Sequence, residues 1–301
     1  MDKPRISVYV ISYNQEDVIR RAMDSLIEQR DYIYEICIND DCSTDRTFEI
    51  LQEYERKYPG LVKPVRNEHN LGIFKNTEAV WHRLTGDIIH DVSGDDAAIP
   101  GYFKKVLDFI EKKKIDWKNE LFCIYGDYMQ IGADGSKTLF RNSLVTDTNA
   151  MKLKVRKLVS GRSACYSKKV LDRFEDVSDG RSFRVELAQD CQLQLFAEHN
   201  YYLPELGNIY YAEIGISSKM SHDEHMEDTL GGYDFFMDYL ARHGRQLDKK
   251  DKAFIDYMRA YRKGDMGKAL KYYLKSIDLS LGWKGLGLDR IVYVIKKKLR
   301  K

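Results

Sequence analysis

The sequence contains few cysteines, and they follow no recognisable framework. Its 301 residues include five cysteines, an odd number with no C-x-x-C spacing. Small secreted domains depend on even numbers of cysteines that pair as disulfides, so this class of protein is excluded. We expect the thiols to be reduced, as they are in the cytosol.

Long apolar runs and a strong net charge are also missing. No stretch approaches the roughly 20 apolar residues that cross a bilayer, and we identify no apolar signal segment at Met1–Pro4. The formal net charge is only +2, which excludes a protein that binds nucleic acid through a global positive field. With 43% hydrophobic and 32% charged residues, the composition predicts a soluble globular protein.

Apolar residues follow two alternating periods in the first third of the chain. Ile6–Ile11 is a β-branched run typical of a strand, and apolar residues recur at helical spacing from Val18 to Ile27. Strands alternating with helices predict right-handed crossovers and a doubly wound, mostly parallel sheet. The further elements expected are strands at Tyr34–Asn39, Val62–Val65 and Asp87–Val92, helices at Phe48–Tyr58 (capped by Ser43 or Thr44) and Phe74–Leu84, and a helix opened by Pro100.

Polar clusters follow three strands of this sheet, at Ser12–Glu16, Asp40–Asp45 and Ser93–Asp96. Ligands of open α/β sheets bind beyond the carboxyl ends of the strands. We therefore expect the three clusters to converge on one edge of the sheet.

The pattern changes after Tyr125. Tyr128–Ile131 and Lys137–Phe140 flank a turn-forming pentapeptide, which predicts an antiparallel hairpin and a mixed sheet. Later elements are expected as a helix at Glu186–Glu198, a last strand at Ile209–Glu213, and helices from about Asp223, including a helical hairpin that turns at Gly264-Asp265. We divide the chain into an α/β domain at residues 1–222 and a helical C-terminal extension at 223–301.

Two adjacent carboxylates stand out in Ser93-Gly94-Asp95-Asp96. A hard divalent cation that keeps water ligands and binds substrate phosphates suits such a pair. The alternative is a helix cap before Pro100, but one carboxylate would suffice for that role. The sequence therefore favours a metal site at Asp95 and Asp96.

Asp41 and Tyr13 are candidates for holding a nucleobase. A carboxylate just past a strand can accept a hydrogen bond from a base N–H, and a tyrosine ring can stack on the same base. The alternatives are a turn or helix cap for the Asp41 segment and ordinary packing for Tyr13. For phosphate charge, Lys75, Arg83 and Arg162 are the candidate cations, although most surface cations are simply solvated.

These residues together resemble the inverting family 2 glycosyltransferases of the GT-A fold over about residues 5 to 105. The ordered elements that carry the resemblance are Ile6-Ser7-Val8-Tyr9-Val10-Ile11-Ser12-Tyr13-Asn14, Ser25-Leu26-Ile27-Glu28-Gln29, Asp40-Asp41-Cys42-Ser43-Thr44-Asp45, Asn70-Leu71-Gly72, Thr85-Gly86-Asp87 and Ser93-Gly94-Asp95-Asp96. The fold class expected is therefore α/β of GT-A type, a doubly wound mixed sheet with mostly parallel strands.

The resemblance also implies roles for particular residues. Tyr13 and Asp41 would contact the donor base, with Ile11 and Lys75 as further donor-binding candidates. Asp95 and Asp96 would lie at the metal (Mn²⁺ or Mg²⁺) and the diphosphate. A later acid would be the catalytic base, and Asp190 matches it best.

Three features leave parts of this assignment open. Glu186 competes with Asp190, which could also be an ordinary first-turn helix acid. Ser93 stands where many relatives carry the first acid of an Asp-x-Asp triplet, so either Asp95 or Asp96 could ligate the metal directly. The late Tyr-Arg-x-His-like element of some relatives reads here as Tyr211-Ala212-Glu213-Ile214, without its histidine.

The resemblance implies transfer of a sugar, with UDP as the expected nucleotide, to a saccharide or lipid-linked saccharide acceptor in bacterial surface-polysaccharide synthesis. One alternative is a nucleotidyltransferase, but the loop at Ser12–Glu16 lacks the glycine and lysine those enzymes carry. The other is a catalytically silent scaffold of the same fold, and the retained Asp41, Asp95, Asp96 and Asp190 argue against it.

The C-terminus predicts a basic amphipathic helix. Its apolar face comprises Leu288, Ile291, Val292, Ile295 and Leu299, and five basic residues crowd positions 296–301. Such a helix can lie on an anionic membrane or pack on its own domain, and the sequence does not distinguish the two. The expected location is the cytoplasm, or the inner face of the cell membrane if the helix binds it.

Overall fold

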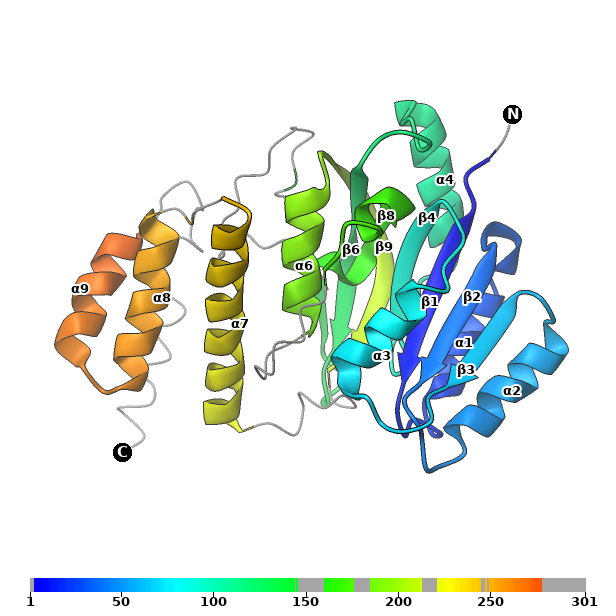
Figure 1. The fold of residues 1–301 in the computed structure, drawn as a ribbon, viewed down its shortest axis with the longest axis horizontal. Coiled ribbons are helices and arrows are strands. Elements are labelled where there is room, and N and C mark those ends of the chain that lie inside the picture. Colours follow the sequence, from blue (N-terminus) through cyan, green and yellow to red (C-terminus); the bar gives the residue numbers. More distant parts are fainter. Residues whose placement is uncertain are drawn as a thin grey trace. The chain divides into compact units, whose positions relative to one another are not determined.

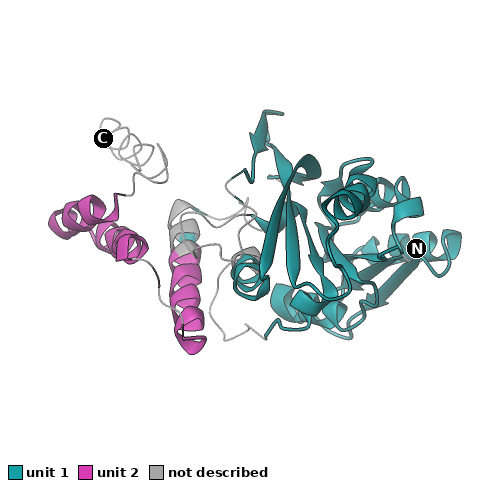
Figure 2. Ribbon diagram, turned by 90° about the horizontal axis from the view of Figure 1, so that it is seen from above, with its two compact units in different colours: residues 1–151, 159–181, 185–225 teal, residues 152–158, 182–184, 226–301 magenta. Residues whose placement is uncertain are grey.

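The computed structural model describes residues 3–143, 145, 160–175, 185–212, 221–244, 247 and 249–277. The predicted tail helix at 288–301 lies outside these residues. Two compact units divide the chain (Figure 2): unit 1 comprises residues 1–151, 159–181 and 185–225, and unit 2 comprises 152–158, 182–184 and 226–301. Among the described residues, no helix has the length and apolarity needed to span a membrane.

Unit 1 is built on one mixed sheet, which has nine strands within the described residues (Figure 1). Its strand order is β3-β2-β1-β4-β8-β6-β9-β5, with β7 paired to β6. The strands are β1 (Ile6–Ser12), β2 (Glu35–Asp40), β3 (Val62–Arg66), β4 (Ile88–Ser93), β5 (Ala97–Ala98), β6 (Phe122–Ile131), β7 (Lys137–Phe140), β8 (Ala164–Ser167) and β9 (His199–Tyr211). The first four are mutually parallel, and β8 joins them antiparallel to β4 and β6.

Helices cover both faces of this sheet because side chains alternate along each strand. The helices are α1 (Ile19–Ile27), α2 (Thr47–Lys57), α3 (Gly72–Trp81), α4 (Tyr102–Lys113), α5 (Lys168–Leu171) and α6 (Val185–Phe196). Val8 and Val10 of β1 share a core with α1, α2 and α4. Tyr9, between them, belongs to the opposite core, which α3, α5 and α6 complete. The predicted alternation of strands and helices is confirmed.

Some predicted boundaries are wrong. Neither Ser43 nor Thr44 caps α2, because the helix begins only at Thr47 and the Ser43 hydroxyl donates to Asp40 instead. Asp45 accepts a hydrogen bond from Thr47 N at 2.9 Å. Pro100 lies two residues before α4 rather than in its first turn, since Gly101 in the left-handed region is the N-cap. The last strand is also much longer than predicted.

The helices of unit 2 follow the predicted pattern. Most of α7 (His222–Arg242) belongs to it, followed by α8 (Lys249–Arg262) and α9 (Met266–Ser276). Leu230 of α7 packs with Phe254 and Met258 of α8. The turn between α8 and α9 uses Gly264, whose φ of 73° favours glycine, as the predicted hairpin requires.

A buried carboxylate ties three parallel strands together. Glu35, at the start of β2, accepts hydrogen bonds from Ser7 Oγ (2.7 Å), Thr85 N (2.6 Å) and Lys63 Nζ (2.6 Å). Burial alone would raise the pKa of Glu35, but the hydrogen bonds from Lys63, Ser7 and Thr85 outweigh burial and lower its pKa to about 2. The ionised carboxylate therefore stabilises the fold.

We predict that Glu35 makes stability depend on pH in acid. Its pKa is about 2 when folded and 4.5 in its ordinary state, so its contribution, on the order of 3 kcal/mol, is complete above that ordinary value and is lost as pH falls toward 2. Urea unfolding of wild type and Glu35→Gln between about pH 6 and pH 3 measures this difference. The exposed Glu49→Gln variant should keep the wild-type slope, and an unchanged slope in Glu35→Gln would contradict the assignment.

Candidate functional site

The ends of β1, β2 and β4 lie side by side at one edge of the sheet. In the parallel ladders Ser12 pairs with Asp40, and Ile11 pairs with Ser93. Just beyond the strands, Asp41 N donates to Ser12 O at 2.9 Å and Gly94 N donates to Ile11 O at 3.1 Å. The structure therefore brings the three predicted polar clusters together.

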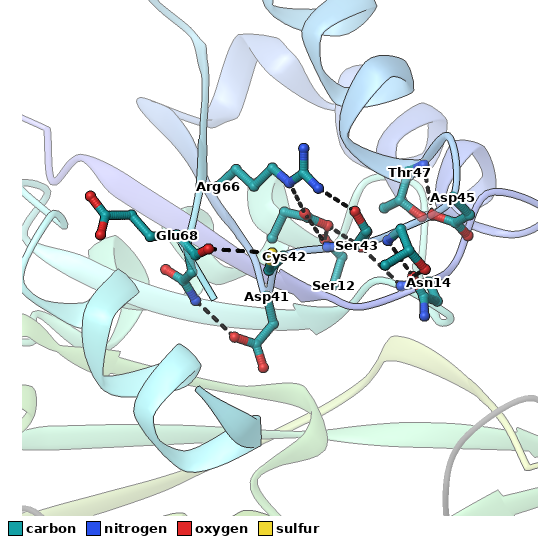
Figure 3. A network of polar contacts seen from close by, with 12 residues as sticks. Ser12, Asn14, Asp41, Cys42, Ser43, Asp45, Thr47, Arg66 and Glu68 are labelled. Atoms are coloured by element: carbon teal, nitrogen blue, oxygen red, sulfur yellow. Dashed lines mark hydrogen bonds and ion pairs between the residues drawn. The ribbon is translucent and has the colours of Figure 1, made fainter. Parts of the chain in front are cut away.

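The loops after β1 and β2 are bonded to each other. Asn14 and Cys42 are both in the left-handed region, with φ of 50° and 60°, which is uncommon for residues other than glycine. Asn14 N donates to Ser43 Oγ at 2.9 Å, and Thr44 N donates to Asn14 Oδ1 at 2.8 Å (Figure 3). These bonds hold two strained turns in a fixed relation.

Asp40 is an internal support of this edge. Its carboxylate accepts from Ser12 Oγ (3.1 Å) and Ser43 N (2.9 Å) and lies 3.7 Å from Arg66 Nε (Figure 3). The side chain is fully buried. Asp40 therefore fixes the loop that presents the next residue, Asp41.

Asp41 is buried and accepts three hydrogen bonds from the segment that leads into α3. The donors are Asn67 Nδ2 (2.9 Å), Leu71 N (2.8 Å) and Gly72 N (2.9 Å). Tyr13, by contrast, is 43% exposed. The two residues predicted to hold the base thus differ: the carboxylate of Asp41 is fixed by hydrogen bonds, whereas the ring of Tyr13 is accessible. They follow the adjacent strands β2 and β1.

The turn at Gly94 has no room for a side chain. A Cβ there would lie 2.2 Å from Gln15 Oε1 and 3.0 Å from the carbonyl oxygen of Ile11. Glycine is needed because the turn after β4 passes directly over the end of β1. This close passage places Asp95 next to the β1 loop.

Asp95 and Asp96 are both buried, at 8% and 6% exposure. Asp96 Oδ1 accepts from Tyr211 N at 3.0 Å, and its Oδ2 lies 3.8 Å from Arg162 Nη1. Arg21, on α1, donates to the backbone oxygen of Asp95. Two arginines therefore hold the acidic turn from different elements.

Each of these arginines stacks on a tyrosine of β9. The guanidinium carbon of Arg21 lies 3.6 Å from the ring centre of Tyr211, and that of Arg162 lies 3.7 Å from the ring centre of Tyr210. Consecutive strand residues point to opposite faces. The two stacked pairs therefore approach the acidic turn from opposite faces of β9.

Burial raises the pKa of Asp96 to about 7, and the neighbouring charge of Asp95 adds to the increase. Arg162, the Tyr211 N–H and Arg21 act in the opposite direction without cancelling it. A divalent cation beside the pair would favour its ionised form.

Asp190 lies on α6, and the backbone of residues 161–162 connects it to the acidic turn. Gly161 N donates to Asp190 Oδ1 at 2.6 Å, and the next residue is Arg162, the partner of Asp96. A Cβ at Gly161 would lie 2.5 Å from that carboxylate oxygen. Gln189, beside Asp190, donates to Tyr9 Oη at 2.9 Å and so fixes this turn of α6 on the sheet.

The predicted cations have different surroundings. Lys75 is accessible and pairs with Glu78 at 3.1 Å on the same helix. Arg83 instead donates to the carbonyl oxygens of Ile38 (2.9 Å) and Lys63 (2.6 Å), so it holds β2 and β3 together rather than facing a phosphate. The side chain of Glu186, like residues Glu213 and Ile214, lies outside the described part of the chain.

The residues present fit a divalent ion that keeps other ligands. Within the described ranges, no group of three or more His, Cys, Asp or Glu side chains could enclose a metal. Asp95 and Asp96 supply carboxylate oxygens from one side, and Mg²⁺-type sites are commonly completed by substrate phosphates and water. The arrangement suits an ion brought together with a diphosphate.

Sequence reasoning missed several residues of this site. Their sequence context did not mark four residues, because each contacts a partner 29 to 115 positions away in the chain. These residues are Arg21, Gly161, Tyr210 and Tyr211. For Tyr210 and Tyr211 a signal was available, because the last strand carries four tyrosines, at positions 201, 202, 210 and 211.

Comparison with known proteins assigns the N-terminal half of the chain to a family. Residues 7–153 match the model of "Glycosyl transferase family 2". A Mycobacterium tuberculosis protein of uncharacterised function, Rv1520, is 39% identical over 92 residues, which are 30% of this chain and 27% of that protein. TuaG of Bacillus subtilis, a candidate glycosyltransferase of teichuronic acid biosynthesis, is 30% identical over 150 residues, 50% of this chain and 58% of TuaG. The matched stretch therefore spans between about a quarter and three fifths of these relatives.

A solved structure resembles most of the chain. The Staphylococcus aureus protein TarS, residues 1–349 in complex with UDP-GlcNAc, superposes with a TM-score of 0.57 at 16% identity over 90% of each chain. At this identity the likeness concerns the fold, and it confirms the predicted GT-A type α/β class with C-terminal helices. Residues 7–153 of this chain therefore form a glycosyltransferase family 2 domain.

Proposed function

We propose that this protein transfers a sugar from a nucleoside-diphosphate donor, with UDP as the nucleotide, to a saccharide or lipid-linked saccharide acceptor. The proposal includes a divalent metal ion, inversion at the anomeric carbon, and a cytoplasmic role in synthesis of a surface polysaccharide such as capsule, O-antigen or exopolysaccharide. One observation carries it: Asp95-Asp96 and Asp190 are joined through Arg162 and Gly161 beside the Asp41 loop. The TarS complex with UDP-GlcNAc supports a uridine donor, and TuaG supports the polysaccharide context.

The donor is assigned to the β1–β2–β4 edge. Asp41 would meet the base, with the exposed ring of Tyr13 available for stacking and Ile11 and Lys75 as further contacts. Asp95 and Asp96 would hold the divalent ion, which supplies positive charge to the diphosphate leaving group. Either carboxylate could make the direct contact; Asp96 also faces Tyr211 N and Arg162, so Asp95 is the position at which the metal contact is tested.

Asp190 is the proposed general base. It would take the proton of an acceptor hydroxyl as that oxygen bonds to the anomeric carbon and the bond to the diphosphate oxygen breaks on the opposite face. The proton remains on Asp190 and the nucleoside diphosphate departs. One such displacement inverts the anomeric centre.

The acceptor is assigned to the side of Asp190 formed by the β6–β7 hairpin. Tyr128 of β6 lies within electrostatic reach of Arg162 and Asp190, and its ring stacks on Phe140 at 4.8 Å with an interplanar angle of 3°. Phe140 and Leu139 are partly exposed. Aromatic rings beside a base suit the apolar faces of a sugar.

We predict that Asp190→Asn lowers kcat of sugar transfer by about 100-fold or more, because general-base catalysis contributes roughly 10²–10⁴. Asparagine keeps an oxygen for the Gly161 N–H, so nucleotide affinity should not change. Transfer is measured with a panel of nucleotide sugars, and binding by calorimetry.

The matched control is Asp172→Asn, which removes an exposed carboxylate of unit 1 and should leave both quantities unchanged. Transfer at the wild-type rate by Asp190→Asn would show that the base is another residue. Release of pyrophosphate from a nucleoside triphosphate and a sugar phosphate would instead indicate a nucleotidyltransferase.

We predict that UDP binding depends on Mn²⁺ and on Asp95. Chelation with EDTA and the Asp95→Asn substitution should each weaken UDP binding at least about tenfold, since the attraction of the divalent ion for the diphosphate is lost or reduced. Calorimetry of the full chain measures both. Equal UDP affinity with and without Mn²⁺ would exclude the metal assignment, and no nucleotide binding at all would favour a silent scaffold.

Asp96 gives a separate prediction for the metal-free protein. Its pKa is about 7 in the folded protein and 3.8 ordinarily, so the folded state binds this proton more tightly than the unfolded state. The free energy of unfolding should therefore fall as pH rises from about 4 to 7, by on the order of 4 kcal/mol. Asp96→Asn should abolish that decrease in urea unfolding. In contrast, Asp41→Asn should destabilise by about 1–3 kcal/mol at pH 8, because the NH₂ group that replaces one carboxylate oxygen would face at least one of the three N–H donors. The reverse order of effects would contradict the roles given to these two carboxylates.

A further inference from the structure

The helix α9 of unit 2 exposes a row of large apolar side chains. Met266, Leu270 and Leu274 are 47%, 60% and 59% exposed, the last two being the most exposed large apolar residues among those described. Their spacing of four places them on one face of the helix. The site in unit 1 uses none of them, so the proposed sugar transfer does not explain the row.

A different face of α9 makes its contact with α8. Ala269 and Ser276 are buried, and the ring of Tyr273 lies 5.7 Å from that of Tyr257 on α8. The exposed row is therefore a second apolar face in addition to the one that stabilises the helical hairpin. Contiguous apolar surface of this kind marks an interaction site.

The charged side chains of α9 are all basic. Lys268, Lys271 and Lys275 are exposed, and residues 266–276 include no acid, although Lys268 pairs with the capping Asp265 at 2.9 Å. Residues 266–301 contain ten lysines and arginines and two aspartates, a net charge of +8 in a chain whose total is +2. Residues 1–265 consequently carry −6.

We propose that α9 binds the surface of an anionic lipid bilayer, with Met266, Leu270 and Leu274 inserted among the lipids. An apolar row flanked by lysines is the pattern of an interfacial helix, and each basic residue adds to its attraction for anionic lipid. Charge complementarity selects this occupant. A second copy that associated symmetrically through the same region would bring +8 against +8, and residues 278–301, with seven basic residues, would bring like charge to the lysines of α9.

The test is cosedimentation of the full chain with vesicles. Wild type should bind vesicles that contain phosphatidylglycerol, should bind pure phosphatidylcholine vesicles at least about tenfold more weakly, and should dissociate as salt rises from about 0.1 M to 1 M. Leu270→Ser/Leu274→Ser should weaken binding to phosphatidylglycerol vesicles at least about tenfold. The matched control, Val65→Ser/Tyr32→Ser, changes two exposed apolar residues of unit 1 and should bind as wild type.

Two further measurements separate the other occupants. If residues 278–301 or another part of the chain covered the row, Leu270→Ser/Leu274→Ser would lower the thermal midpoint without vesicles, whereas an exposed row predicts no measurable change. If a second copy covered it, wild type would be a dimer that this variant dissociates. Either result, or unchanged vesicle binding by the variant, would overturn the proposal. Asp190→Asn should bind vesicles normally, so failure of the sugar-transfer assignment would leave this test intact.

Discussion

The site depends on keeping two adjacent carboxylates buried on one turn. Neighbouring negative charges removed from water are strongly unfavourable unless donors and cations surround them. Here the surroundings come from distant parts of the chain: Tyr211 N and Arg162 face Asp96, and Arg21 holds the backbone of Asp95. The pairing of β5 with β9, through Ala97 and Ile209, is what brings Tyr211 to this turn.

The parallel part of the fold could be predicted because its signal is local. β1, β2 and β4 are short apolar runs, each followed within a few residues by a polar cluster and, for the first two, by a helix with one apolar face. Strand ends in such a sheet share an edge, so the convergence of Tyr13, Asp41 and Asp95 followed from topology alone. The carboxylate at Asp190 required the family resemblance as well, since nothing local distinguishes it from other helix acids.

The rest could not be predicted because it depends on pairings between distant segments. β5 has two residues and β8 has four, too few for a periodic signal, yet β8 joins β4 to β6 and completes the sheet. The cap expected at Ser43 failed for a similar reason, because its hydroxyl is bonded to Asp40 and to Asn14 of another loop. Tertiary contacts thus overrode a sound local preference.

The closest backbone approaches of the site limit which residues can replace Gly94 and Gly161. A Cβ at Gly94 would lie 2.2 Å from Gln15 Oε1, and a Cβ at Gly161 would lie 2.5 Å from Asp190 Oδ1, so a larger residue at either position would displace that side chain. The four residues of β7 are all exposed, and the hairpin that carries them can change without disturbing those contacts. Substitutions are therefore easier to accommodate in β7 than at the two glycines.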